Sequence, residues 1–150
     1  MRTVKKFAAI VLVGAMALSM AACKKGGKKV SVDDFKKACE EVGLTVETLG
    51  AGGGMKEAYG CQNSDGSLEV NYCIVEDKDS AKKDFKQYTD MEDTFKAMGA
   101  DVKISGTRME MSVAENYMLA VLVDDMFISI SSEGAESTKI AKDLVSKLGV

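Results

Sequence analysis

The sequence predicts an α+β fold, in which an antiparallel sheet of about seven strands packs with about three helices in the order α-βββ-α-ββββ-α. Three observations support this class. Apolar residues alternate with polar ones through residues 102–130, which predicts a four-stranded C-terminal meander. Three other segments carry apolar residues at three- and four-residue spacing, as amphipathic helices do. Asp65-Gly66 lies between two apolar segments and is a strong hairpin signal.

The first helix is expected over residues 33–42, with Ser31 as its N-cap and Gly43 at its end. A strand is then expected over residues 44–49. The glycine-rich segment 50–54 that follows lacks the Lys-Ser/Thr pair of a phosphate-binding loop, and the residues after it have strand character. We therefore interpret it as a connection between strands.

A β-hairpin is predicted from residues 57–63 and 68–76, on either side of the Asp-Gly turn. A two-residue turn places Cys61 opposite Val70 on the core-facing side. Cys73 then points to the other face of the sheet.

The second half of the chain repeats the pattern of a helix followed by strands. A long helix is expected over residues 79–98, and a final helix over 135–148. Between them, short turns connect four strands whose alternating apolar residues we expect on one face of the sheet, with the helices covering that face. These residues are Val102, Ile104, Met109, Met111, Val113, Tyr117, Leu119, Val121, Val123, Met126, Ile128 and Ile130.

Charge divides the chain into two parts. Residues 1–29 hold seven of the 20 basic residues and none of the 23 acidic ones, so residues 30–150 carry 13 basic and 23 acidic side chains, a formal charge of −10. An acidic domain repels the phosphates of nucleic acid, so no nucleic-acid partner is expected.

The N-terminal segment has the organisation of an export signal. Arg2, Lys5 and Lys6 precede an apolar run over residues 7–22 that is short for a membrane-spanning helix. The run ends in Leu-Ser-Met-Ala-Ala before Cys23. This ending resembles the lipobox of bacterial lipoproteins, in which small residues precede the cysteine, although Met20 stands where that family usually has leucine.

The resemblance implies that residues 1–22 are a cleaved signal peptide and that Cys23 receives a diacylglyceryl group. Residues 23–29 would then be the lipidated cysteine and a basic, flexible tether, and residues 30–150 a single extracytoplasmic α+β domain. The membrane would be reached through the lipid on Cys23. The alternative is ordinary signal cleavage after Ala21.

Three cysteines remain in the mature domain: Cys39, Cys61 and Cys73. We interpret them first as small buried apolar residues, since a free cysteine behaves in that way. The second interpretation is a single disulfide, for which Cys39 and Cys61 are the preferred pair. Zinc binding is not expected, because the chain has no histidine and no CxxC motif.

A possible partner-binding patch lies on the second face of the last predicted hairpin, where Met118, Leu122 and Phe127 are large and apolar. The alternative is that both faces of the sheet are covered, which would bury these side chains.

No catalytic, cofactor-binding or metal-binding motif is predicted, and the absence of histidine removes the commonest general base. The sequence therefore favours a non-enzymatic lipoprotein on the extracytoplasmic face of the cell membrane that binds a protein partner in the cell envelope. The first alternative is capture of a small molecule or peptide between helix and sheet. A hydrolase that uses carboxylates alone is a less favoured alternative.

Overall fold

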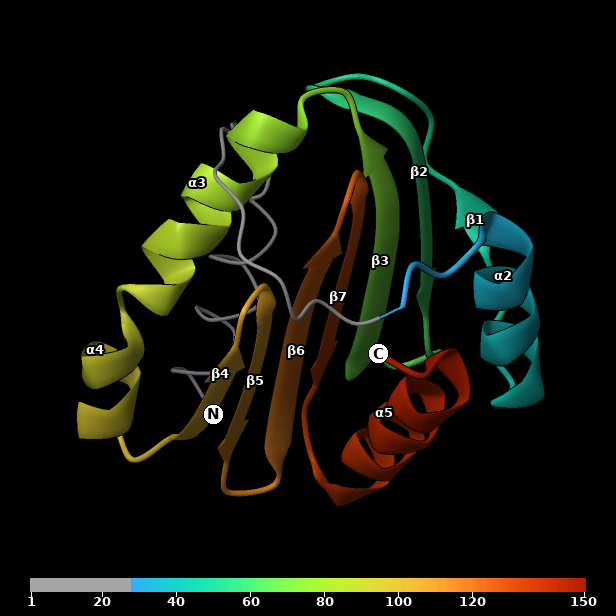
Figure 1. Ribbon diagram of the computed structural model, residues 1–150. Helices are drawn as coiled ribbons and strands as arrows, with labels where there is room; N and C mark the ends of the chain where they lie inside the picture. Colours follow the sequence, from blue (N-terminus) through green and yellow to red (C-terminus); the bar gives the residue numbers. More distant parts are fainter. Residues whose placement is uncertain (1–27) are drawn as a thin grey trace.

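A seven-stranded antiparallel sheet, in the order β1-β2-β3-β7-β6-β5-β4, forms the centre of the computed structural model, which describes residues 28–150 (Figure 1). The predicted signal peptide, Cys23 and most of the tether lie outside the described residues. The strands are β1 (Glu47–Thr48), β2 (Met55–Gln62), β3 (Leu68–Val75), β4 (Asp101–Ser105), β5 (Arg108–Val113), β6 (Asn116–Val123) and β7 (Met126–Ser132). The described helices are α2 (Val32–Glu41), α3 (Lys78–Thr89), α4 (Glu92–Ala97) and α5 (Ala135–Leu148). The predicted fold class and element order are confirmed, with α3 and α4 together in the place of one long helix.

Helix α2 begins and ends close to its predicted limits. The Ser31 hydroxyl accepts a hydrogen bond from the Asp34 backbone N–H at 3.1 Å, which satisfies one of the free donors at the helix N-terminus. Gly43 follows with a φ of 83°, a left-handed conformation that ends helices and favours glycine. Phe35 and Cys39 project from one side of α2 into the core, and both are fully buried.

The predicted hairpin register is confirmed, since Cys61 pairs with Val70 across β2 and β3. Cys73 pairs with Ala58 and packs in the cluster on the other side of the sheet. Strand β3 then pairs with β7, which joins the strands of the N-terminal half to the C-terminal meander. The first predicted strand, over residues 44–49, is reduced to the two residues of β1.

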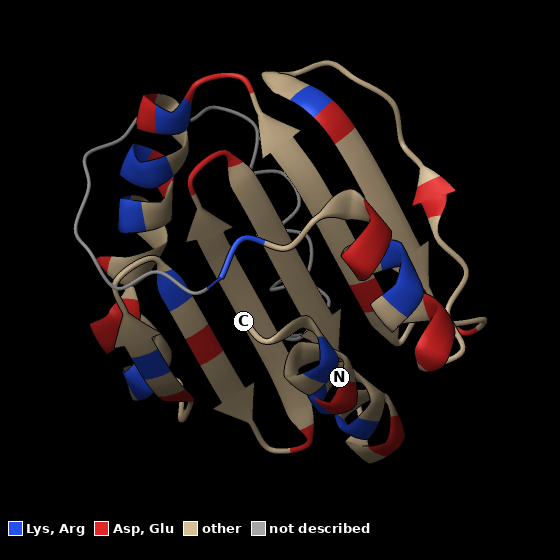
Figure 2. Ribbon diagram, turned by 45° about the vertical axis from the view of Figure 1, so that its right-hand side comes forward, with Lys and Arg blue, Asp and Glu red and all other residues tan. Residues whose placement is uncertain are grey.

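Helices cover both faces of the sheet, which corrects the expectation that they would cover only one. Phe35 of α2 and Leu144 of α5 belong to the core cluster on the first face. Phe85 of α3 and Phe95 of α4 belong to the cluster on the second face. Charged residues lie along the outward sides of these helices (Figure 2), as the solvent-exposed side of an amphipathic helix requires.

The apolar residues of the meander do not all share one face, as we had expected. Val113 pairs with Asn116 across a two-residue turn, so Met111 lies opposite Met118 and not opposite Leu119. The expected arrangement required a three-residue turn here, one residue longer than the observed turn. A change of one residue in the register moves every side chain of a strand to the opposite face of the sheet. The apolar residues of β4 and β5 therefore face α3 and α4, while Tyr117 and its alternate neighbours on β6 face α5.

The predicted helix over residues 79–98 is interrupted between α3 and α4. At the break, the Thr89 hydroxyl donates to the Lys86 carbonyl oxygen at 2.9 Å. The Met91 N–H bonds to the Tyr88 carbonyl, three residues earlier rather than four. This tightened turn changes the direction of the chain and lets α4 reach β4, while α3 packs near β6.

Met118 and Leu122 are buried under α3 and α4, with 7% and 1% of their surface exposed, and Phe127 packs against the same cluster. They therefore do not form the exposed partner patch that the sequence suggested. The alternative, a sheet covered on both faces, is the arrangement observed. Strand β6 is apolar along almost its whole length because both of its sides are buried.

Replacement of Leu122 by alanine tests this burial. We expect L122A to lower the free energy of unfolding by about 2–5 kcal/mol, because it removes packed methyl groups and leaves a cavity. Chemical denaturation of the variant and of L49A measures the effect. Leu49 is 59% exposed, so its truncation should change stability little. Equal effects of the two substitutions would contradict a buried Leu122.

Candidate functional site

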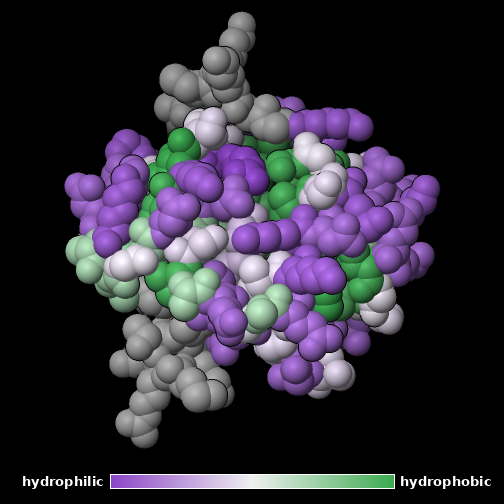
Figure 3. Space-filling view, turned by 90° about the horizontal axis from the view of Figure 1, so that it is seen from below, coloured by the Kyte–Doolittle hydropathy of each residue, from purple (hydrophilic) through white to green (hydrophobic). Residues whose placement is uncertain are grey.

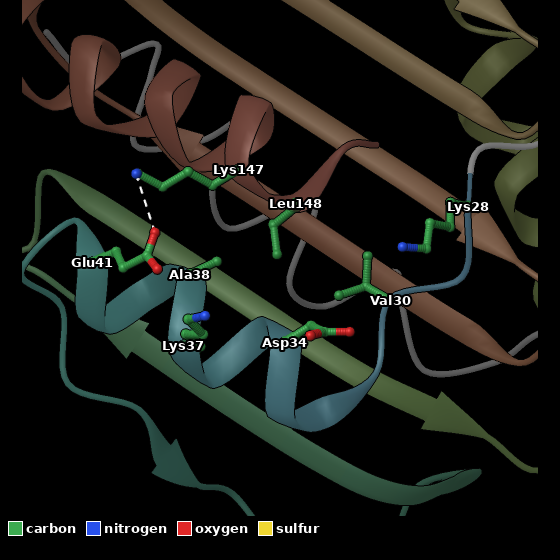
Figure 4. A pocket seen from close by; sticks show the side chains of 8 residues that line it. All are labelled: Lys28, Val30, Asp34, Lys37, Ala38, Glu41, Lys147 and Leu148. Atoms are coloured by element: carbon green, nitrogen blue, oxygen red, sulfur yellow. Dashed lines mark hydrogen bonds and ion pairs between the residues drawn. The ribbon is translucent and has the colours of Figure 1, made fainter.

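The candidate site is a groove of about 220 Å³ between α2 and the C-terminal end of α5, called here the α2–α5 groove (Figure 4). Its floor consists of Val30, Ala38 and Leu148, which are all buried. Charged side chains surround this floor: Lys28, Asp34, Lys37, Glu41 and Lys147. The groove therefore combines an apolar base with a rim of three ammonium groups and two carboxylates.

The two carboxylates of the rim both have partners. Lys147 of α5 forms an ion pair with Glu41 of α2 at 3.2 Å, and Figure 4 shows this pair bridging the two helices at one end of the groove. Asp34 accepts a hydrogen bond from the Ser31 hydroxyl at 2.8 Å. Within residues 28–150, Lys28 and Lys37 form no ion pair. Two ammonium groups beside an apolar floor suit a ligand that carries a negative charge and an apolar group.

The chain segment that enters the domain is fixed beside this groove. The Val30 N–H lies 3.1 Å from the Met126 sulfur, and the Val30 carbonyl accepts a hydrogen bond from the Tyr72 hydroxyl at 2.9 Å. Lys29 forms a hydrogen-bonded ion pair with Asp125 in the turn between β6 and β7. Residues 29–30 are therefore held at a defined point of the surface, at the end of the groove where Lys28 lies.

The electrostatics of these contacts keep them formed at neutral pH. The hydrogen bond from Lys29 holds the pKa of Asp125 below its usual range, so this carboxylate stays charged. Burial raises the pKa of Tyr72 to about 12, so its hydroxyl keeps the proton that it donates to Val30.

A second, larger groove of about 460 Å³ lies at the β1 edge of the sheet. Polar side chains from β2, β3 and their connection dominate its lining, among them Gln62, Asn63 and Asn71. Gly60 lets the Leu49 side chain pack closely there, since a Cβ at this position would come within 2.9 Å of it and would displace it. This groove shares no lining residue with the first one.

The cysteines occupy buried positions. Cys39 and Cys61 lie side by side under α2, with their sulfur atoms 3.4 Å apart, and Cys73 is buried on the opposite face. All three are free thiols in the structure, as the first interpretation of the sequence expected. The structure also brings together the pair preferred for a disulfide.

Sequence reasoning did not find the α2–α5 groove. Its residues come from positions 28–41 and 147–148, and nothing in the sequence shows that α2 and α5 are neighbours. The one available signal was that both amphipathic helices need the same apolar face of the sheet.

Other kinds of site find no support in the described part of the chain. Residues 28–150 contain no group of three or more Cys, Asp or Glu side chains placed to hold a metal ion. None of the helices in this part is long and apolar enough to cross a membrane. Viewed from the end that carries the β5–β6 turn, the surface is mainly hydrophilic, with apolar side chains in separate areas (Figure 3).

Comparison with known proteins gives no relative from which a role could be transferred. No protein-family model, no curated protein and no solved structure matches the chain.

Substitution of Tyr72 by phenylalanine tests how the N-terminal segment is held. We expect Y72F to lower the free energy of unfolding by about 1–2 kcal/mol, because the buried Val30 carbonyl loses its hydrogen bond. Limited proteolysis should also cut the segment around Lys28 and Lys29 faster than in the unmodified protein. The control is Y59F, since the Tyr59 hydroxyl bonds only to an exposed carboxylate, that of Glu57. If Y72F behaves like Y59F, the segment is not held by this bond.

Proposed function

We propose that this protein is a lipoprotein, anchored through Cys23 to the extracytoplasmic face of the cell membrane, and that it acts as a non-enzymatic accessory module that binds a protein partner in the cell envelope. The observation that carries the proposal is that the N-terminal segment of the described residues lies beside the α2–α5 groove. Lys28 belongs to the groove, and Lys29 and Val30 are fixed to the β6–β7 turn and to Tyr72.

The tether limits where the groove can lie. Val30 follows Cys23 by seven residues, and a fully extended chain of that length spans at most about 25 Å. The segment is fixed to the domain from Lys29 onward, so no more than this length can separate the lipid from the end of the groove. A lipid on Cys23 would therefore hold the α2–α5 groove close to the membrane surface.

The charge of the groove indicates the chemistry of the partner. Its rim carries three lysines against two carboxylates, whereas residues 30–150 as a whole carry a formal charge of −10. A local excess of positive charge on an acidic domain favours an acidic segment of a partner over the surfaces of most other proteins. The apolar floor adds room for one apolar side chain of that segment. We infer a membrane-bound partner that presents an acidic, partly apolar segment near the membrane surface.

A second candidate function is capture of a small polar molecule or a peptide. The groove at the β1 edge favours it, because Gln62, Asn63 and Asn71 bring amide groups to a space of about 460 Å³. Tyr59, Tyr72 and Tyr88 line neither groove, so neither groove offers an aromatic ring to such a ligand. The protein-binding function is therefore preferred.

Site-specific photo-crosslinking in native membranes tests the proposal. A photoreactive residue in place of Lys37, on the rim of the groove, should give one dominant crosslinked protein. The same residue in place of Lys83, an exposed lysine of α3 on the other face of the sheet, should not. Cys23→Ser should abolish the product by releasing the domain from the membrane.

A charge reversal extends the test to affinity. K37E should reduce recovery of the partner by tenfold or more, while K83E should leave it unchanged. The proposal fails if position 37 gives no product above the Cys23→Ser background, or if positions 37 and 83 give the same products.

A further inference from the structure

The side chains of Cys39 and Cys61 meet across the interface between α2 and β2. Their sulfur atoms are 3.4 Å apart, and 0% and 6% of the two residues is exposed. The two sulfurs would have to approach by a little over 1 Å to reach the bond length of a disulfide, about 2.04 Å. Both cysteines belong to the same core cluster, so no other element separates them.

The position of the third cysteine makes the pairing selective. Cys73 lies on the opposite face of the sheet, in the cluster under α3 and α4. The sheet itself therefore separates Cys73 from the other two thiols. Burial also raises the pKa of the Cys73 thiol to about 11, which keeps it in the unreactive protonated form.

We propose that Cys39 and Cys61 form a disulfide bond when the chain folds in the presence of a disulfide donor, and that Cys73 stays a free thiol. The bond covalently joins α2, one wall of the α2–α5 groove, to strand β2. It links two residues that are 22 positions apart, closes a loop that contains β1 and the glycine-rich connection, and restricts the unfolded chain accordingly.

The reaction is a thiol–disulfide exchange with a protein or small-molecule disulfide as oxidant. One cysteine thiolate attacks a sulfur of the donor, which forms a mixed disulfide and releases one donor thiol. The thiolate of the second cysteine then attacks the mixed disulfide, forms the Cys39–Cys61 bond and releases the second donor thiol. The two cysteines lose two protons and two electrons in total, and the donor disulfide is reduced to two thiols.

Burial determines when this exchange takes place. Both cysteines are buried in the folded domain, and the contact with the Cys61 sulfur together with burial raises the pKa of Cys39. A donor therefore reaches the pair before α2 packs on the sheet. Once formed, the bond is covered by α2 and shielded from reductants.

Refolding under redox control tests the proposal without depending on export or on a partner. The full chain carrying Cys23→Ser, purified in detergent, is unfolded, reduced and refolded in a mixture of reduced and oxidised glutathione. Free thiols are then blocked with N-ethylmaleimide in denaturant. Cleavage after glutamate separates Cys61 from Cys73 at Glu69, so mass spectrometry assigns each cysteine.

The proposal predicts a linked pair of peptides containing Cys39 and Cys61, with N-ethylmaleimide on Cys73. The same link should form with Cys73→Ser added. Reduction should lower the midpoint of thermal unfolding by about 5–15 °C, and should leave the midpoint of a Cys39→Ala/Cys61→Ala variant unchanged. The proposal is overturned if Cys39 and Cys61 are alkylated after refolding, or if Cys73 is found in the linked peptides. A result of either kind would leave the crosslinking test of the proposed function unaffected.

Discussion

The antiparallel pairing of β3 with β7 is the contact on which the rest of this fold depends. It runs over seven residue pairs, from Leu68 with Ser132 to Ile74 with Met126. It joins the β1-β2-β3 sheet of the N-terminal half to the β4–β7 meander of the C-terminal half. Without it, each half would expose a long apolar strand at an open edge, and such edges are prone to pair with other chains. The pairing of β3 with β7 inside one sheet removes both open edges.

The central strands β3, β6 and β7 are therefore covered on both sides, whereas β4 and β5 are covered mainly on the second face. Helices α2 and α5 lie over the part of the first face formed mainly by β3, β7 and β6, while α3 and α4 lie over the second face toward β4 and β5. At the β4–β5 end, the first face carries polar groups such as the Arg108–Glu110 ion pair, at 2.7 Å. This division makes α2 and α5 neighbours. Their adjacency produces the α2–α5 groove, and the segment that enters α2 lies at one end of this groove.

The sequence was sufficient to predict the elements and most of their order. The limits of α2 and α5 and the register of Cys61 with Val70 followed from capping residues, apolar spacing and one Asp-Gly turn. These signals are local, so they can be recognised in a single sequence. The break between α3 and α4 is also local, but the Thr89 hydroxyl bond that accompanies it does not interrupt the apolar spacing of the helix.

Features that depend on relations between elements could not be predicted. The face of the sheet on which the apolar residues of β4 and β5 lie depends on the length of the turn at Ala114-Glu115. Apolar alternation alone does not determine this length. Met118 and Leu122 were expected to form an exposed apolar patch, because the sequence does not show that α3 packs over them. For the same reason the α2–α5 groove, built from segments more than 100 residues apart, was not found. The proximity of Cys39 and Cys61 entered only the second interpretation of the cysteines, which placed both on the core side of elements whose periodicity was clear.

We propose that a lipid on Cys23 holds the α2–α5 groove toward the membrane. Paramagnetic relaxation enhancement on the lipidated protein, in nanodiscs with gadolinium-labelled lipid headgroups, measures this orientation. We expect strong broadening of amide signals from residues 28–41 and around Lys147, and little broadening in α3 and α4. Broadening that is strongest in α3 and α4, or equal over the whole domain, would contradict it.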